Sequence, residues 1–420
     1  MGSILLHIHP SRVNEASIRF SRTCGLGGMA VLLVVIQILT GILLRFYYVA
    51  SPAEAYNSIL FLKNEVLFGQ LIRNIHHWSG VFLLLFAFLH LLRVFFTGAY
   101  SDKRKINWLF GLILLVLIVF SNFTGYLLPW DQLAYWAITV GTTIISYIPL
   151  FGDGLRALII GGKEVNGGTL QTFYTFHTAV LPFLLLILVI YHFWRVRKAG
   201  GVLIPEEDEK AEKVPVMPNL VYKEFIVALV LIAIILVFAT FFNAPLHEKA
   251  NPAFSMNPTK APWYFAGIQE LLMHFHPFFA AFIIPLGVMV FLAWIPFLDY
   301  GGKEMGNWFI SEKGRSSAKS AAIFAAGLTL AGILFNQYVV NFEILVPKMP
   351  AFISNGIIPL VILMLFMAAY YRLYIKRIAL TKAELVQVIF VFIIVAFIVL
   401  TLVGIFFRGK DMELTMPWKL

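Results

Sequence analysis

Nine runs of about 20 mainly apolar residues constrain this chain more than any other feature of its sequence. A helix needs about 20 such residues to cross roughly 30 Å of hydrocarbon, where every backbone polar group must be bonded within the structure. The sequence therefore predicts an all-α polytopic membrane protein with about nine transmembrane helices. The runs cover residues 26–49, 75–97, 107–128, 175–195, 221–243, 277–298, 318–340, 353–376 and 384–408.

Composition narrows the class of protein further. Apolar residues make up 60% of the chain and charged residues 13%, whereas soluble domains have about 45–50% and about 25%. The net charge of +10 comes from Lys and Arg in loops between the apolar runs, which indicates membrane orientation rather than binding to nucleic acid. A single cysteine, Cys24, excludes internal disulfides and iron–sulfur clusters held by the chain's own cysteines.

The charged residues predict how the chain is oriented in the membrane and where it divides into parts. Positive residues are more numerous in the N-terminal segment and in alternate loops from there, so the N-terminus is predicted on the negative (n) side and the C-terminus on the positive (p) side. A bacterial inner membrane is the expected location. A charged, proline-containing stretch separates two blocks of helices. The predicted parts are a four-helix domain (1–200), a linker (201–220), a second helical domain (221–345) and additional C-terminal helices (346–420).

Four histidines lie at or within apolar runs, where a polar side chain is costly and indicates function. His76 and His90 are 14 residues apart, nearly four helical turns, and so share a face about 21 Å apart along the axis. His177 and His192 are 15 apart, and Pro182 between them can bend the helix enough to absorb the extra residue. Two antiparallel helices with these pairs can supply two bis-imidazole haem sites stacked across the membrane. For any one of them alone, a bond to a backbone carbonyl is the alternative.

Four glycines repeat the 14-residue spacing of His76 and His90, and two arginines lie close to these histidines in sequence. Glycine is unfavourable inside a helix unless something requires a close approach, and a flat porphyrin edge at each depth would do so; small-residue helix packing is the alternative. Arg73 and Arg93 each lie three residues from a histidine, where a guanidinium could pair with a haem propionate or simply extend to the membrane surface. The glycines, 14 residues apart on the first and third runs, are Gly27, Gly41, Gly111 and Gly125.

A family resemblance rests on local motifs in the first 270 residues. With them the chain resembles cytochrome b of the Rieske/cytochrome b (cytochrome bc or b-f type) complexes. The spacing of 15 and Asp131 are more similar to the photosynthetic branch, in which the cytochrome b6 part and the subunit IV part are separate chains; here the linker joins them. The motifs are Leu71-Ile-Arg-Asn-Ile-His76, Phe88-Leu-His90-Leu-Leu-Arg93, Thr124-Gly-Tyr-Leu-Leu-Pro-Trp-Asp-Gln132, Tyr135-Trp136, Phe176-His-Thr-Ala-Val-Leu-Pro182 and Pro262-Trp-Tyr-Phe265.

The resemblance implies a di-haem subunit of a quinol oxidoreductase. It pairs His76 with His177 for a p-side haem b, and His90 with His192 for an n-side haem b. Quinol (menaquinol or ubiquinol) would be oxidised on the p side, with one electron passing to a Rieske iron–sulfur protein and the other across both haems to an n-side quinone, coupled to proton translocation. A cytochrome c or multihaem cytochrome and a second copy of the complex are the other implied partners. The implied quinol-site residues are Pro129, Trp130, Tyr135, Trp136, Gly141, Trp263, Tyr264 and Glu270.

The quinol loop departs from the family pattern. Where relatives usually have a glutamate that accepts a quinol proton, this chain has Pro262, which cannot accept one. The nearest downstream carboxylate is Glu270, less than two turns beyond Tyr264 if the segment is helical. We expect Glu270 to be the acceptor, with a solvated surface residue as the alternative. The other candidates are His274, His276 and Asp131.

Two further alternatives stay open. The resemblance extends weakly to Cys24, where photosynthetic relatives attach a third haem covalently; an ordinary small apolar residue at a helix start is the other interpretation. At the level of function, the alternatives are a di-haem subunit of a hydrogenase or formate dehydrogenase complex, and a transporter. A transporter would contain no haem.

Overall fold

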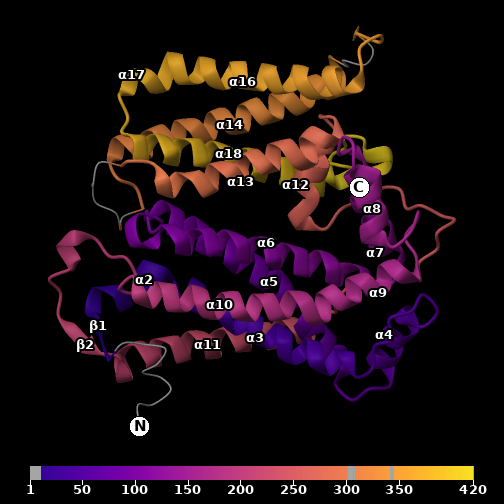
Figure 1. The fold of residues 1–420 in the computed structure, drawn as a ribbon, viewed down its shortest axis with the longest axis horizontal. Coiled ribbons are helices and arrows are strands. Elements are labelled where there is room, and N and C mark those ends of the chain that lie inside the picture. The colour runs from indigo at the N-terminus through magenta and orange to yellow at the C-terminus, as the bar shows by residue number, and fades with distance from the viewer. Residues whose placement is uncertain (1–10, 301–305, 307, 341–344, 420) are drawn as a thin grey trace. The chain divides into compact units, whose positions relative to one another are not determined.

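The computed structural model describes residues 11–300, 306, 308–340 and 345–419. Within these ranges the chain is almost entirely helical, and nine helices are long and apolar enough to cross a membrane, as Figure 1 shows. The prediction of an all-α polytopic membrane protein is therefore confirmed. The nine helices span Leu26–Arg45, Gly69–Phe96, Asp102–Leu127, Gly167–Lys198, Val216–Phe241, Phe279–Phe297, Glu312–Tyr338, Ile353–Ile378 and Lys382–Phe406.

The chain forms two compact units, and the first contains both pairs of membrane histidines. Its helices pack in sequence, α3 on α5, α5 on α6 and α6 on α10. The long helix after the linker, α11, also belongs to this unit and packs on α5 and α3. The helices are α2 (Phe20–Thr23), α3 (Leu26–Arg45), α4 (Ala55–Asn64), α5 (Gly69–Phe96), α6 (Lys105–Leu127), α9 (Gly167–Thr175), α10 (Leu181–Lys198) and α11 (Val216–Phe241).

The charged linker is attached to the N-terminal segment. Strand β1 (Arg12–Asn14) pairs antiparallel with β2 (Lys213–Pro215), which leads directly into α11. Arg22 forms an ion pair with Asp208 of the linker. The linker is therefore held against the start of the chain by backbone and side-chain bonds, which its composition alone did not indicate. The four-part division of the chain stays a prediction.

The second unit contains the later helices and part of the stretch after α6. Its last helix, α18, packs on α14 and on the short helix α12. The sequence predicts short helices and loops over 130–174 and 244–276, and short helices do form there. The remaining helices are α7 (Gln132–Thr143), which lies across the boundary of the two units, α8 (Gly152–Ile160), α12 (Trp263–Leu272), α13 (Ile284–Trp294), α14 (Glu312–Tyr338), α16 (Ile358–Tyr370), α17 (Lys376–Ile378) and α18 (Lys382–Phe406).

Candidate haem and quinol sites

The four membrane histidines form two facing pairs in the first unit. The ring centroids of His76 and His177 are 6.1 Å apart with planes at 80°, and those of His90 and His192 are 6.5 Å apart at 78°. Metal–imidazole bonds are about 2 Å long, so two rings on opposite sides of one metal ion have centroids roughly 6 Å apart. Both pairs have the separation that one haem iron requires.

Each of the four glycines faces one of these rings. The distances join a Cβ built on the glycine to the Cε1 atom of the ring. Three of them are too short to accommodate a side chain without adjustment, and the one at Gly111 is at the limit of ordinary contact. The glycines therefore keep the space beside each imidazole open, as the haem-clearance hypothesis expects. The contacts are Gly27 with His90 at 3.2 Å, Gly41 with His76 at 3.3 Å, Gly111 with His192 at 3.4 Å and Gly125 with His177 at 2.5 Å.

Hydrogen bonds orient the two rings of the predicted p-side pair. His177 Nδ1 donates to the Ser121 carbonyl at 3.0 Å, since a carbonyl can only accept. His76 Nδ1 lies 2.9 Å from Thr40 Oγ1, whose own proton is donated to the Ile36 carbonyl at 2.6 Å, so the hydroxyl accepts from the ring. Both Nδ1 atoms therefore carry the proton, which leaves each Nε2 lone pair available to a metal.

The threonine contacts were not predicted, although a repeated Thr-Gly dipeptide indicates them. Thr40 directly precedes Gly41, and Thr124, 3.3 Å from His177 Nδ1, directly precedes Gly125. On the first span, Thr40 contacts His76 and Gly41 leaves space beside its ring. On the third span, Thr124 and Gly125 do the same for His177.

A π-helical turn, η4 (Phe176–Val180), absorbs the extra residue between His177 and His192. A π turn has i→i+5 bonds and accommodates one more residue than an α turn. Pro182 follows at once and has no N–H to continue the regular pattern. The sequence predicts that a bend at Pro182 absorbs the extra residue; in the structure the π turn in front of that proline absorbs it.

Arg73 and Arg93 are both buried, so neither extends to the surface. Arg73 donates from its two terminal nitrogens to the carbonyls of Ala244 (2.9 Å) and Pro245 (2.6 Å). Arg93 Nε donates to the Arg22 carbonyl at 3.0 Å. A guanidinium has five N–H donors, so further donors remain, and pairing with propionates stays a prediction.

The predicted quinol-site residues divide between the two units. Trp130 and Tyr135 lie in the first unit with their rings 5.6 Å apart, and Pro129 precedes them. Trp136 and Gly141 lie on the α7 segment of the second unit. Trp263 and Tyr264 open α12 in that unit, with ring centroids 5.8 Å apart. Trp130 with Tyr135, and Trp263 with Tyr264, thus form one aromatic pair in each unit.

Asp131 has a structural role in the first unit. It is 5% exposed, and its carboxylate accepts from the backbone N–H of Ala134 (2.9 Å) and of His247 (3.0 Å). The two bonds begin α7 and fix the segment that follows α11. A carboxylate with both oxygens engaged in this way is a weak candidate for a proton acceptor.

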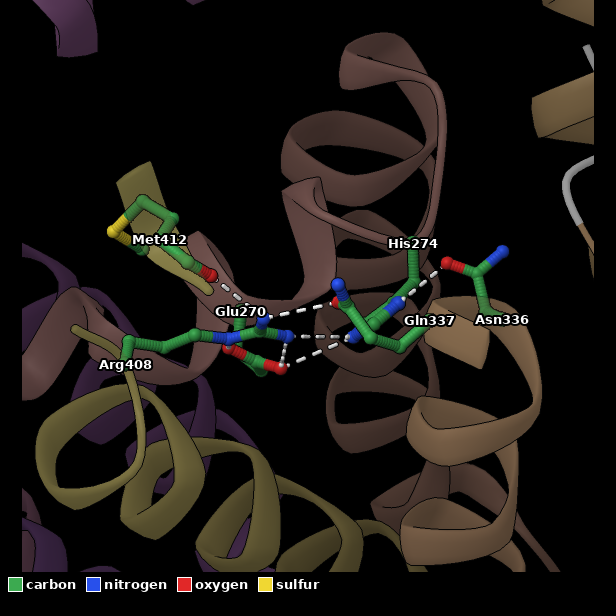
Figure 2. Close-up of polar contacts among 6 residues, drawn as sticks. All are labelled: Glu270, His274, Asn336, Gln337, Arg408 and Met412. Carbon is green, nitrogen blue, oxygen red and sulfur yellow. Dashed lines mark hydrogen bonds and ion pairs between the residues drawn. The ribbon is translucent and has the colours of Figure 1, made fainter. Parts of the chain in front are cut away.

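Glu270 lies on α12, as the helical expectation requires, but it is 0% exposed, so the alternative of a solvated surface residue is wrong. Figure 2 shows the cluster around it. Arg408 binds it with two bonds, Nε to Oε2 at 2.8 Å and Nη2 to Oε1 at 2.5 Å. His274 Nε2 lies 3.0 Å from Oε1, and its Nδ1 lies 2.7 Å from Asn336 Oδ1. Gln337 and the Met412 carbonyl accept from Arg408 Nη1.

The cluster sets the basicity of Glu270. Burial favours the neutral acid, but the hydrogen bonds and charges of Arg408 and His274 outweigh it and hold the pKa of Glu270 below its ordinary value. A carboxylate with a lowered pKa accepts a proton less readily, which weighs against the predicted acceptor role. The pKa of His276 is also lowered, by burial, and its Nδ1 accepts from the Phe278 N–H at 3.3 Å.

Cys24 is exposed and lies in a turn. Its φ of 49° caps α2, and α3 begins only at Leu26. Its thiol therefore does not take a position on the face of a spanning helix, and its direction is set by the turn.

Replacing Cys24 with alanine tests the covalent haem. If a third haem is attached there, we expect haem that stays with the denatured parent chain in a gel to disappear in Cys24→Ala. Haem that persists in the variant would exclude the attachment.

Comparison with known proteins identifies the first unit. The family model for Cytochrome b/b6/petB matches residues 13–200. The chain is 43% identical over 175 residues to a cytochrome b6 of Heliomicrobium gestii, a match that covers 42% of this chain and 82% of the relative. The chain belongs to the cytochrome b/b6 family. It is accordingly a haem-binding electron-transport protein of an oxidoreductase complex, with transmembrane helices.

This cytochrome b family member is also similar to a second relative in sequence and to a solved structure in fold. It is 40% identical over 195 residues to the menaquinol:cytochrome c reductase cytochrome b subunit of Geobacillus thermodenitrificans, which covers 46% of this chain and 87% of the relative. A chain of a hyperthermophilic respiratory Complex III matches with a TM-score of 0.66 and 23% identity, over 94% of this chain and 93% of that chain. The fold of the later helices is therefore shared as well, which fits a fused cytochrome b6–subunit IV form.

A methyl group at Gly125 should selectively disturb a haem held by His76 and His177. A Cβ there would lie 2.5 Å from His177 Cε1, and overpacking of this kind costs about 1–3 kcal/mol. We expect Gly125→Ala to lower the content or shift the potential of one haem only, as measured by redox titration of the absorbance. Gly28→Ala is the matched control, since a Cβ at Gly28 meets nothing within 4 Å; equal effects of both variants would contradict the clearance role.

Proposed function

We propose that this chain is the di-haem cytochrome b subunit of a quinol oxidoreductase that delivers electrons to cytochrome c or another acceptor. The observation that carries the proposal is the arrangement of two histidine pairs, each with two facing glycines, at two depths of one helix bundle. His76 with His177 would hold the p-side haem, and His90 with His192 the n-side haem. When bound, each haem supplies a one-electron carrier.

The chain's own residues would prepare these sites. Ser121 and Thr40 orient the two p-side imidazoles through Nδ1, and the glycines keep the ring edges accessible. Arg73 and Arg93 would neutralise propionates with the donors that backbone carbonyls leave available. Apolar helices around the pairs exclude water, so charge could cross the membrane without movement of charged side chains.

Quinol oxidation would take place on the p side, at the start of α12, where Trp263 and Tyr264 lie. A quinol that gives up two electrons also releases two protons, so a proton acceptor is needed near Trp263 and Tyr264. His274 and His276 are the proposed acceptors, because the lowered pKa of Glu270 weighs against the acceptor role predicted for it. One electron would leave to a Rieske iron–sulfur protein and one to an n-side quinone, so that proton release and uptake occur on opposite sides.

The haem content and redox titration of the purified protein test this proposal. We expect two haems b per chain with distinct midpoint potentials, reduction by a quinol analogue, and co-purification of subunits that contain an iron–sulfur cluster and a cytochrome. A colourless protein would exclude the haem-binding role. A di-haem protein that no quinol reduces would retain the haem sites and exclude quinol oxidation.

A further inference from the structure

The last spanning helix, α18, packs very closely against α12, the helix that opens with Trp263. A Cβ on Gly404 would lie 2.7 Å from the Ala266 carbonyl oxygen, and one on Gly267 would lie 2.6 Å from Thr401 Oγ1. At the first contact the neighbour is backbone, which cannot rotate away. Glycines on both helices therefore set a short, fixed distance between α12 and α18.

Hydrogen bonds also join the segment before α12 to the C-terminal end of α18 and the residues that follow it. Asn257 Nδ2 donates to Asp411 Oδ1 at 2.5 Å, and the Asp411 N–H donates back to Asn257 Oδ1 at 2.7 Å. Lys260 Nζ donates to the Ile405 carbonyl at 3.0 Å. The segment that leads into α12 is thus bonded to the last turn of α18 and to the segment that follows it.

The ion pair of Arg408 and Glu270 completes this attachment, with both side chains 0% exposed. Removing one partner of a buried pair leaves an uncompensated charge and costs about 3–5 kcal/mol, whereas replacing both partners is often neutral. If the pair only holds the two helices in position, removing the second charge should restore what removing the first one destroys. If Glu270 instead takes part in the chemistry, removing Arg408 as well should restore nothing.

We propose that Arg408 is a positioning residue for quinol oxidation: through Glu270 it holds α12, and with it Trp263 and Tyr264, in the orientation that binds quinol. The inference rests on the proposed function, because it concerns the site that this function requires. It gives the last helix a role in that site, and it gives Glu270 a positional role in place of proton acceptance.

A double-mutant cycle on the purified complex tests the proposal. We expect Arg408→Gln and Glu270→Gln each to lower quinol-dependent haem reduction at least tenfold, about 1.4 kcal/mol in barrier. We expect the double variant to recover most of the parent rate. In the folded fraction of Arg408→Gln, the apparent KM for quinol should rise, which simple loss of folded protein would not cause. Arg315→Gln is the control, because Arg315 is exposed and its 3.4 Å pair with Glu312 is on the surface of the same unit.

The outcomes distinguish the roles. A double variant as slow as Glu270→Gln would overturn the proposal and assign proton acceptance to Glu270. The midpoint of thermal unfolding tests the pair without reference to quinol: it should fall in both single variants and recover in the double variant. Equal midpoints in all four proteins would overturn the positioning role. A parent complex that does not oxidise quinol would overturn the proposed function, while the midpoints would still report on the pair.

Discussion

Replacing His90 with alanine is expected to remove the n-side haem b and to leave the p-side haem b spectrally intact. The two histidine pairs are separate, with ring centroids 6.5 Å apart in one and 6.1 Å apart in the other, and neither pair shares a ligand with the other. An iron that keeps only His192 loses half of its protein ligation. The reduced-minus-oxidised spectrum and the haem content per chain measure the result.

His77→Ala is the matched control for this prediction. His77 lies on the same helix and its ring contacts Trp78 at 4.7 Å rather than a second histidine. We expect this variant to keep both haems. Loss of both haems from a folded His90→Ala protein would show that the ligands are paired differently.

Replacing Glu270 with glutamine is expected to lower quinol oxidation at least tenfold, about 1.4 kcal/mol in barrier, without altering either haem spectrum. Glutamine leaves Arg408 buried without a counter-charge, so the contact that holds α12 in place is lost. Because the pKa of Glu270 lies below its ordinary value, this carboxylate stays ionised from pH 6 to 8. The ratio of parent to variant rates should therefore be constant over that range, as initial rates with a quinol analogue would measure.

A Glu270→Gln rate within twofold of the parent from pH 6 to 8 would remove this residue from the mechanism. The search would then move to His274, which shares the Glu270 cluster, and to His276, whose ring lies 5.5 Å from that of Tyr147. His274→Gln and His276→Gln would be the next variants to measure.

The spanning helices and the facing histidines were predictable from sequence for a physical reason. Hydrocarbon imposes a length and an apolar composition on each span, and helical geometry relates the spacing of His76 and His90 to their shared face. Thr40 and Thr124 each directly precede a glycine of the 14-residue pattern, Gly41 and Gly125. The threonines that contact the histidines could therefore also have been predicted from the sequence.

The Arg408 contact was not predictable in this way. Arg408 and Glu270 are 138 residues apart, and an arginine just past an apolar run has the sequence signature of a residue at the membrane surface. Only the packing of α18 on α12 brings the two together. The same holds for Asp131, whose acidity suggests chemistry but whose carboxylate accepts one of its two backbone bonds from His247, 116 residues away.

The π turn at Phe176–Val180 has a genetic consequence. In a regular α-helix, one inserted residue rotates everything beyond it by about 100°. A π turn confines that rotation to itself, so a single codon gained between His177 and His192 leaves both imidazoles facing their partners. The other ligand helix has no such turn between His76 and His90. We therefore expect deletion of one residue to be tolerated between the ligands of the fourth span, where the π turn can return to an α turn. We expect the same deletion between His76 and His90 to abolish haem binding, because the second span has no such turn.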